Sequence, residues 1–395
     1  MKKHSYIVIS SLLIFSWIVF GCKKIDLSNS TIQCNSSAPT FNYSKSAELQ
    51  TIINKYATLG IPGISVAIKT SSEEWCGVAG YSKIETQTPM QICNLQYAQS
   101  IVKTYTAVLV MKLYEEGKID LEMPINKYLP SNIADHITNS NRITVKMLLN
   151  HTSGIFDYAY DYTYSANLLS KQDKIFNYLD LISVAYDKKS QFEPGSQYSY
   201  CNTNFLLLAI MVNEVTGKDH SIMMTDVIFK PLGLTNTYYK NEPGYLNYPE
   251  LVNCYLNRTS DNRIENVSKT QVNNVTAMIG DDGIVATPMD YTHFLHGLAH
   301  GQLLQKQSLD LMMNWVLNKK GDPAYGLGLT YRKHNTHWGF GHGGSGIGAG
   351  GILYYFPDKD VTIFVGVNFG TLLDGPFNDL YEQMKVELLN VVLDQ

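Results

Sequence analysis

Charged residues and motifs for phosphate binding are what this 395-residue chain has least of. Charged residues make up 17% of the sequence and the formal net charge is −4. This balance predicts neither a basic surface for nucleic acid nor an acidic tail. The chain has no G-x-x-x-x-G-K-[ST] motif, no paired C-x-x-C motifs and no repeat of solenoid length, which argues against a P-loop, a zinc ribbon and a solenoid. A DNA-binding protein, a coiled coil and a disordered chain are excluded.

Cysteine is also scarce, with six residues, whereas hydrophobic residues make up 45% of the chain. A chain of this length and composition is globular and suits one large two-lobed unit or two domains. It can bury a sizeable core without the help of disulfides. We predict one disulfide, between Cys76 and Cys93, because both stand at the outer ends of a predicted hairpin. The alternative is that both are small buried apolar residues.

The N-terminus predicts export. A basic start (KKH) precedes an apolar run over residues 6–20, which is typical of a secretory signal and short for a membrane span. The run ends in V-F-G-C, which resembles a bacterial lipobox and makes Cys22 the expected lipidation site. We therefore expect a signal peptide over residues 1–21, a polar tether over residues 22–42, and a lipid-anchored protein of the bacterial cell envelope that faces the periplasm. Ordinary signal cleavage nearby is the alternative.

Residues 43–395 show the periodicities of a mixed fold. Apolar spacing predicts helices over residues 46–59, 100–116, 287–298, 308–317 and 374–392, and strands over residues 64–69, 74–78, 92–95, 325–331, 337–342, 351–356 and 361–368. These elements predict an α/β plus α fold, in which an antiparallel sheet is flanked by N- and C-terminal helices and a mainly helical lobe is inserted. The α/β lobe is expected at about 43–117 and 281–395, and the helical lobe at about 118–280.

Ser100 and Lys103 form an S-x-x-K motif at the start of a predicted helix. Three residues are almost one helical turn, so the lysine amine returns beside the serine hydroxyl. A lysine whose pKa is lowered by burial can take the hydroxyl proton, and a helix N-terminus favours a developing oxyanion. The alternative is a solvent-facing lysine beside a capping serine.

Two further segments carry side chains suited to catalysis. Tyr200 and Asn202 are two residues apart in an expected extended segment, so both side chains point to the same side. A phenol can relay a proton to a leaving group, and an amide can bind a substrate carbonyl or amine. His342 ends a predicted strand and is followed by glycines, which leave room for a substrate backbone. Taken singly, these segments are an ordinary Tyr/Asn loop and a turn with a surface histidine.

Together the three segments resemble the serine beta-lactamase-like, penicillin-recognising hydrolases. That group holds class C beta-lactamases, D-alanyl-D-alanine carboxypeptidases and related esterases. The similarity covers about residues 46–390 and includes segments that fall in the family's order, namely LYEEGKIDL at 113–121, LLNHTSG at 148–154, PLGL at 231–234, YGLG at 325–328 and GHGG at 341–344. The resemblance implies a beta-lactamase/transpeptidase-like fold and hydrolysis through an acyl-enzyme. It implies no metal and no organic cofactor.

The resemblance also implies roles for the catalytic residues. Ser100 is expected to be the nucleophile that forms the acyl-enzyme. Lys103 is expected to activate Ser100, and Tyr200 to pass the proton to the leaving group and to help deacylation. Either Lys103 or an ionised Tyr200 is the first base, and the sequence leaves both open.

The same resemblance implies a set of substrate-binding residues. Asn202 is expected to hold the acyl side of the substrate, and His342 stands beside the cleft where many members carry lysine. Gly344 and Ser345 follow in the glycine segment. The oxyanion hole is expected from the backbone N–H groups of Ser100 and Ser345.

Departures from the family pattern bear on the substrate. Gly343 lacks the hydroxyl that many members use to bind a substrate carboxylate, which argues against strict D-alanyl-D-alanine recognition. Arg332, on the preceding predicted strand, is a candidate partner for that carboxylate, and the alternative is a surface arginine. Cys201 stands where a hydroxyl or small residue is usual and is interpreted as a small buried residue. His151 in the LLNHTSG segment is interpreted as structural.

The sequence therefore predicts a serine hydrolase, most similar to a D-Ala-D-Ala carboxypeptidase, that acts on cell-wall or D-residue peptides. A carboxylesterase of the same family is the main alternative. A beta-lactamase is less expected because of His342 and Gly343, and a non-catalytic cell-wall-binding module is least expected. The expected partners are a small-molecule or peptide substrate and, through Cys22, a membrane. No nucleic acid is expected, and the oligomeric state is left open.

Overall fold

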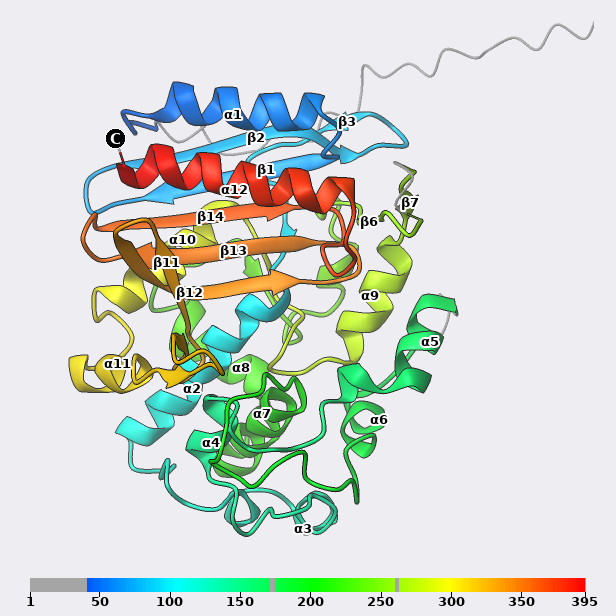
Figure 1. Ribbon diagram of the computed structural model, residues 1–395, viewed down its shortest axis with the longest axis vertical. Helices are drawn as coiled ribbons and strands as arrows, with labels where there is room; N and C mark the ends of the chain where they lie inside the picture. The colour runs from blue at the N-terminus through cyan, green and yellow to red at the C-terminus, as the bar shows by residue number, and fades with distance from the viewer. Residues whose placement is uncertain (1–40, 171–174, 260–262, 395) are drawn as a thin grey trace, which may run out of the picture. The chain divides into compact units, whose positions relative to one another are not determined.

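A nine-stranded antiparallel sheet is the framework of the structure, a computed structural model that describes residues 41–170, 175–259 and 263–394 (Figure 1). The strands follow the order β3-β2-β1-β14-β13-β12-β11-β10-β9. They are β1 (Gly63–Lys69), β2 (Glu74–Lys83), β3 (Thr88–Pro89), β9 (Val316–Leu317), β10 (Pro323–Tyr325), β11 (Thr330–His334), β12 (His337–Ser345), β13 (Gly350–Phe356) and β14 (Val361–Val367). Because β1 pairs with β14, the first and last strands of the chain lie together in the middle of the sheet.

Two small sheets and twelve α-helices complete the described part of the chain. One small sheet joins β4 (Gln96–Tyr97), β8 (Val285–Ala286) and β5 (Thr237–Tyr238), and the other joins β6 (Tyr255–Leu256) and β7 (Glu265–Asn266). The helices are α1 (Ser46–Thr58), α2 (Val102–Glu115), α3 (Ser131–Ala134), α4 (Val145–Leu149), α5 (Tyr162–Ser170), α6 (Tyr178–Ser183), α7 (Thr203–Thr216), α8 (His220–Met224), α9 (Ser268–Ala277), α10 (Pro288–Ala299), α11 (Lys306–Met312) and α12 (Pro376–Asp394).

Alternation along the central strands gives the sheet two apolar faces. Val66, Ile363 and Val365 belong to one core cluster with the buried residues of α1 and α12, which lie along the same face of the sheet (Figure 1). Phe364 and Leu353 point the other way and join the larger cluster with α2, α7 and α10. Successive side chains of a strand point to opposite sides, so each strand contributes to both clusters. Helices cover both faces of the sheet. The predicted fold class is therefore confirmed.

Most of the predicted elements are confirmed, and three are wrong. The strand expected over residues 92–95 is absent, and β3 and β4 lie on either side of it. The strand expected over 325–331 is two strands, because residues 326–329 turn and Gly326 N–H donates to the Leu329 carbonyl (2.7 Å). The helix expected over 308–317 already ends at Met312, and its last residues form β9. The predicted boundaries of the two lobes stay a prediction.

The predicted Cys76–Cys93 disulfide is wrong. Cys76 is a buried free thiol in the middle of β2, where it pairs with Ala67 of β1, and burial raises its pKa to about 12. Cys93 follows β3 in a separate loop and is disulfide-bonded, but not to Cys76. The hairpin that β2 forms is longer than the sequence indicated, so the two cysteines do not stand opposite each other. Cys201 and Cys254 are also buried free thiols.

The predicted signal peptide, Cys22 and the tether up to residue 40 lie outside the described residues. Within the described ranges, no helix combines the length and the apolar character that crossing a bilayer requires. Export and lipidation at Cys22 therefore stay predictions from the sequence.

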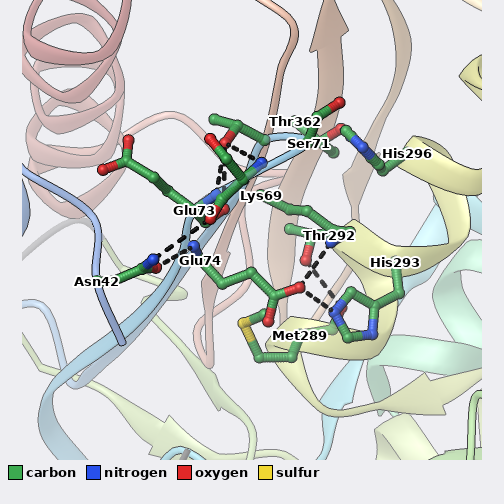
Figure 2. A network of polar contacts seen from close by, with 12 residues as sticks. Asn42, Lys69, Ser71, Glu73, Glu74, Met289, Thr292, His293, His296 and Thr362 are labelled. Atoms are coloured by element: carbon green, nitrogen blue, oxygen red, sulfur yellow. Dashed lines mark hydrogen bonds and ion pairs between the residues drawn. The ribbon is translucent and has the colours of Figure 1, made fainter. Parts of the chain in front are cut away.

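A polar network joins the β1–β2 hairpin to α10 (Figure 2). Glu74 on β2 accepts a hydrogen bond from Lys69 (2.6 Å), and its carboxylate also lies 3.1 Å from Nε2 of His293 on α10. The Glu74 backbone N–H donates to the side-chain oxygen of Asn42, which precedes α1. These contacts attach one end of the sheet to helices on both of its faces. Partly exposed ion pairs of this kind contribute little to stability, so the network fixes geometry more than it adds free energy.

Helix α2 packs directly on the turn that separates β10 from β11. Gly328 in this turn has a φ of +73°, and a Cβ built on it would lie 2.1 Å from the Cβ of Ala107 on α2. The Thr104 hydroxyl donates to the Gly328 carbonyl (2.8 Å), and the Gly328 N–H donates to the Leu149 carbonyl (3.0 Å). Only glycine combines this backbone conformation with so close an approach.

We therefore expect Gly328→Ala to lower the free energy of unfolding by about 2–4 kcal/mol, from backbone strain and from overlap with Ala107. Gly321→Ala is the matched control. Gly321 also has a positive φ (+84°), but its Cβ would meet nothing within 4 Å, so strain alone should cost about 1 kcal/mol. Chemical denaturation of both variants measures the difference. Equal losses would contradict the packing argument.

Candidate active site

Ser100 lies at the N-terminal end of α2, in the 3₁₀ turn η2 (Gln99–Ile101) that leads into the helix. The preceding residue, Gln99, has a φ of +50°, an unusual conformation for a residue other than glycine. The Lys103 ammonium donates to Ser100 Oγ and to the Asp281 carbonyl, each at 3.1 Å. The sequence spacing thus produces the predicted serine–lysine contact.

Lys103 has no solvent exposure, yet it carries a charge. Burial alone would lower the pKa of Lys103, but attraction to Tyr200, Asp281 and Asp282 outweighs burial and raises the pKa above its usual value. Burial thus acts in the predicted direction, but the expectation that the pKa of Lys103 is lowered overall is wrong. Burial raises the pKa of Tyr200, and attraction to the Lys103 ammonium offsets only part of that rise. Both groups thus hold their protons more tightly than isolated side chains do, so the pair must lose one proton before it can accept that of Ser100.

The loop that carries Tyr200 is held by His151. The Ser199 N–H donates to the His151 carbonyl (3.0 Å), and the Cys201 N–H donates to His151 Nδ1 (3.2 Å). His151 thus holds the backbone on both sides of Tyr200, at Ser199 through its carbonyl and at Cys201 through its imidazole, and the rings of His151 and Tyr200 are in contact with their centres 4.3 Å apart. His151 is fully buried and has a φ of +59°. Burial lowers its pKa well below the usual value, so the ring stays neutral and its Nδ1 stays an acceptor.

Asn202 lies beside a buried carboxylate. Its side-chain amide donates to Oδ2 of Asp157 (3.0 Å), and the other oxygen of Asp157 accepts from the Ala159 N–H (3.1 Å). Asp157 is therefore the residue that orients Asn202 at the cleft. Asn204, two residues further on, accepts from the Ser153 hydroxyl (2.8 Å). The LLNHTSG segment and the segment around Tyr200 are thus interlocked by hydrogen bonds.

Strand β12 passes directly against the serine. A Cβ built on Gly344 would lie 2.6 Å from the Ala98 carbonyl oxygen and 3.4 Å from the Ser100 amide nitrogen. Ser345, which follows, is exposed, and its hydroxyl shares a hydrogen bond with Thr371 (2.8 Å). Glycine at position 344 is required for this close approach, which places the end of β12 beside the N-terminus of α2.

His342 lies on β12 with its side chain buried. Its Nε2 lies 2.8 Å from the Tyr325 hydroxyl, and its Nδ1 lies 2.5 Å from the Gly343 carbonyl oxygen. Burial and the nearby Lys103 charge lower the pKa of His342 to about 3. His342 is therefore a neutral imidazole with two hydrogen bonds. It occupies the position at which many of the hydrolases that this sequence resembles carry lysine.

Arg332 on β11 lines the same cavity as Ser100. Its guanidinium carbon lies 5.9 Å from the centre of the Tyr354 ring, and its Nε is buried without a hydrogen-bond partner among the described residues. Arg332 is therefore a cation inside the cleft rather than a surface residue.

One cavity of about 720 Å³ brings these groups together. Its lining includes most of the residues singled out from the sequence, namely Ser100, Tyr200, Asn202, Arg332, His342, Gly344 and Ser345. Lys103 does not itself line the cavity, but it donates to Ser100, which does. Four residues of the site were missed by sequence reasoning, namely Asp157, Tyr158, Asp281 and Tyr325. The only signal for Asp281 was the run GDDG, in which two acidic residues stand between glycines.

Comparison with known proteins identifies the class of the fold and then the family. A crystallised D-stereospecific amidohydrolase from Streptomyces sp. is 26% identical, with a TM-score of 0.73 over 86% of this chain and 98% of that one. The D-amino acid amidase from Ochrobactrum anthropi SV3, crystallised with L-phenylalanine amide, is 22% identical, with a TM-score of 0.76 over 88% of this chain and 98% of that one. Both likenesses place this chain in the beta-lactamase/transpeptidase-like fold.

The model of the Beta-lactamase family matches residues 49–383, so the chain belongs to that family. Protein flp from Staphylococcus aureus is a curated relative, 26% identical over 195 residues. That match covers 49% of this chain and 38% of flp, so this chain spans well under half the length of that relative.

Substitution can test the hydrogen bonds by which His151 holds the loop around Tyr200. We expect His151→Ala to lower kcat about 10- to 100-fold at nearly constant KM, because the phenol loses its orientation beside Ser100. His151→Asn should recover most of this loss, since its amide oxygen can accept from Cys201 and asparagine tolerates a positive φ. Steady-state kinetics on any substrate that the wild type cleaves, together with denaturation curves, measure the effect.

His220→Ala is the control, because His220 is equally buried but bonds to Tyr239 away from the cavity. A kcat that fell equally in the His220 and His151 variants would point to a general loss of packing. Failure of asparagine to restore kcat in a folded protein would contradict the proposed grip.

Proposed function

We propose that this protein is a serine hydrolase that cleaves amide bonds next to D-configured residues through an acyl-enzyme on Ser100. The observation that carries the proposal is the 3.1 Å contact between Ser100 Oγ and a fully buried Lys103, at a cavity that Tyr200 and Asn202 also line. The Streptomyces relative, a D-stereospecific amidohydrolase, supports the choice of substrate.

The geometry gives each side chain a task in such a reaction. Ser100 Oγ attacks the carbonyl carbon, and its proton passes to the Lys103–Tyr200 pair once that pair has lost a proton. The oxyanion forms at the N-terminus of α2, where the Ser100 N–H and the end of β12 at Ser345 meet. The pair then returns the proton to the leaving amine, and water releases the acyl group by the reverse path. Asn202 holds the acyl side of the substrate.

A carboxypeptidase-like activity is the finer form of this proposal. It needs a partner for the carboxylate of the leaving residue, and Arg332 supplies a guanidinium in the cavity whose Nε has no hydrogen-bond partner among the described residues. A carboxylesterase is the second candidate, since the same nucleophile serves esters. A beta-lactamase is disfavoured because His342 is neutral and bonded to Tyr325, which leaves no cation at that position for a carboxylate.

The cellular setting in this proposal is the bacterial envelope. The basic start, the apolar run and Cys22 support export and lipid anchoring facing the periplasm. Peptides with D-residues, such as short fragments of the cell wall, are substrates that such a location supplies.

Labelling of Ser100 tests the proposal directly. We expect a fluorophosphonate to label the purified full chain and Ser100→Ala to abolish the label, because only an activated serine reacts. Labelling by a fluorescent penicillin in parallel would favour a penicillin-recognising peptidase, whereas fluorophosphonate labelling alone would favour an esterase or another amidase. Absence of both labels from a folded sample would contradict the serine hydrolase and favour a binding module.

The role of Arg332 is tested with a pair of substrates. We expect the wild type to cleave D-alanyl-D-alanine faster than its C-terminal amide, and Arg332→Gln to lose about 10- to 100-fold on the free acid only, the cost of one charge-assisted hydrogen bond of about 1.5–3 kcal/mol. Arg142→Gln is the control, because Arg142 pairs with Glu193 on the surface. Equal losses on the acid and the amide would contradict carboxylate binding by Arg332.

A further inference from the structure

One wall of the cavity carries three carboxylates. Asp157 precedes the 3₁₀ turn η4 (Tyr158–Tyr160), and Asp281 and Asp282 follow α9. The three residues line the cavity with exposed fractions of 6%, 2% and 6% respectively. Buried carboxylates normally have a cation beside them, because an unpaired buried charge is costly. A cluster of three therefore requires an account of its counter-charges.

The protein supplies too few cations to this wall. Lys103 donates to the backbone carbonyl of Asp281 and not to its carboxylate. The charge of Lys240 acts to lower the pKa of Asp282, but the Lys240 ammonium donates to the carbonyls of Val275 and Thr276. The two lysine or arginine side chains that line the cavity lie elsewhere, Arg332 on β11 and Lys385 on α12. Lys385 is paired with Glu382 (2.6 Å). The three carboxylates thus outnumber their neighbouring cations, and no ion pair joins them to a cation among the residues that the structure describes.

The hydrogen bonds of the wall leave one fully buried carboxylate oxygen without a partner. Both oxygens of Asp157 accept, from Asn202 and from Ala159. Asp281 Oδ2 accepts from the Tyr158 hydroxyl (2.6 Å), and Asp282 Oδ1 accepts from the Gly283 N–H (2.6 Å). Oδ1 of Asp281, although buried, has no partner among the residues that the structure describes. A buried acceptor without a partner is costly, so a donor supplied by a ligand at this wall would be stabilised.

Electrostatics agree with a missing cation. Burial, offset in part by Lys103 and Tyr158, raises the pKa of Asp281 to about 6. Burial and the charge of Asp281 raise the pKa of Asp282 to about 7. A positive group docked on this wall would stabilise both carboxylates in their ionised form.

We infer that this wall binds the primary ammonium group of the substrate, on the residue whose carbonyl carbon Ser100 attacks. Asp157 belongs to this wall and accepts from Asn202 (3.0 Å), the residue that the proposed function assigns to the acyl side of the substrate. The substrate class is then amides and peptides of D-amino acids with a free amino terminus, rather than N-acylated peptides. This inference rests on the proposed function and deepens it.

The test compares D-phenylalanine amide with N-acetyl-D-phenylalanine amide on the purified full chain. Ammonia release reports turnover, and slower fluorophosphonate labelling of Ser100 reports occupancy without turnover. We expect acetylation to lower kcat/KM, or protection from labelling, by 10-fold or more, because it removes the positive charge. Asp281→Asn should lower kcat/KM on the free amine far more than on the acetylated amide, which brings the two substrates within about threefold.

Asp290→Asn is the matched control. Asp290 has the same exposed fraction as Asp282, accepts from Asn236 and Thr237, and lies outside the cavity lining. If Asp281→Asn does not fold, Asp282→Asn and the comparison of the two substrates on the wild type carry the test.

Each outcome decides between the two levels of the proposal. Equal or better use of the acetylated amide, by turnover or by protection, overturns the ammonium site and leaves the serine hydrolase standing. Failure of both amides to react or protect, while the fluorophosphonate still labels Ser100, also overturns the ammonium site. Loss of fluorophosphonate labelling in a folded wild type overturns the proposed function itself.

Discussion

A lysine ammonium with no access to solvent lies one hydrogen bond from a serine, and much of this structure is arranged around that contact. Burying such a charge costs several kcal/mol unless the surroundings compensate it. Here the compensation comes from the Ser100 hydroxyl, the Asp281 carbonyl and the negative groups around them. The same surroundings that make the charge tolerable also keep Lys103 protonated. Stability and reactivity therefore place opposite demands on this side chain, as is common where a pKa is shifted at a functional site.

Rigid main-chain contacts hold the partners of Lys103 in place. Helix α2 is fixed at Ala107 by the close approach of Gly328, and β12 reaches the serine because position 344 has no side chain. Tyr200 depends on a histidine that grips the loop on both sides of it. Such contacts restrict the positions of the reacting groups, which is what catalysis by positioned groups requires.

The charges around the cavity are unevenly distributed. Carboxylates lie on the wall formed by η4 and the segment after α9, whereas Arg332 lies on the sheet. The nucleophile Ser100 lines the same cavity. His342 is neutral and occupied by Tyr325. A cleft with negative charge on one wall and a single unpaired guanidinium on another discriminates between substrates by the charges at their two ends. This distribution links the fold to the choice of D-amino acid amides and peptides proposed above.

The sequence by itself determined the fold class, the family and the pairing of Ser100 with Lys103. A helix has a fixed period, so three residues of separation are enough to bring a lysine back beside a serine. Periodicity also predicted the central strands and the terminal helices, but it missed the turn at residues 326–329 and the true length of the β1–β2 hairpin.

Only the tertiary structure decided what surrounds the pair. Asp281 lies 178 residues from Lys103, and His151 lies 50 residues from Cys201, whose backbone it holds. Contacts over such separations depend on how the whole core packs, so no local pattern records them. For the same reason the sign of the pKa shift at Lys103 could not be predicted, because it depends on charges that only the folded chain brings together.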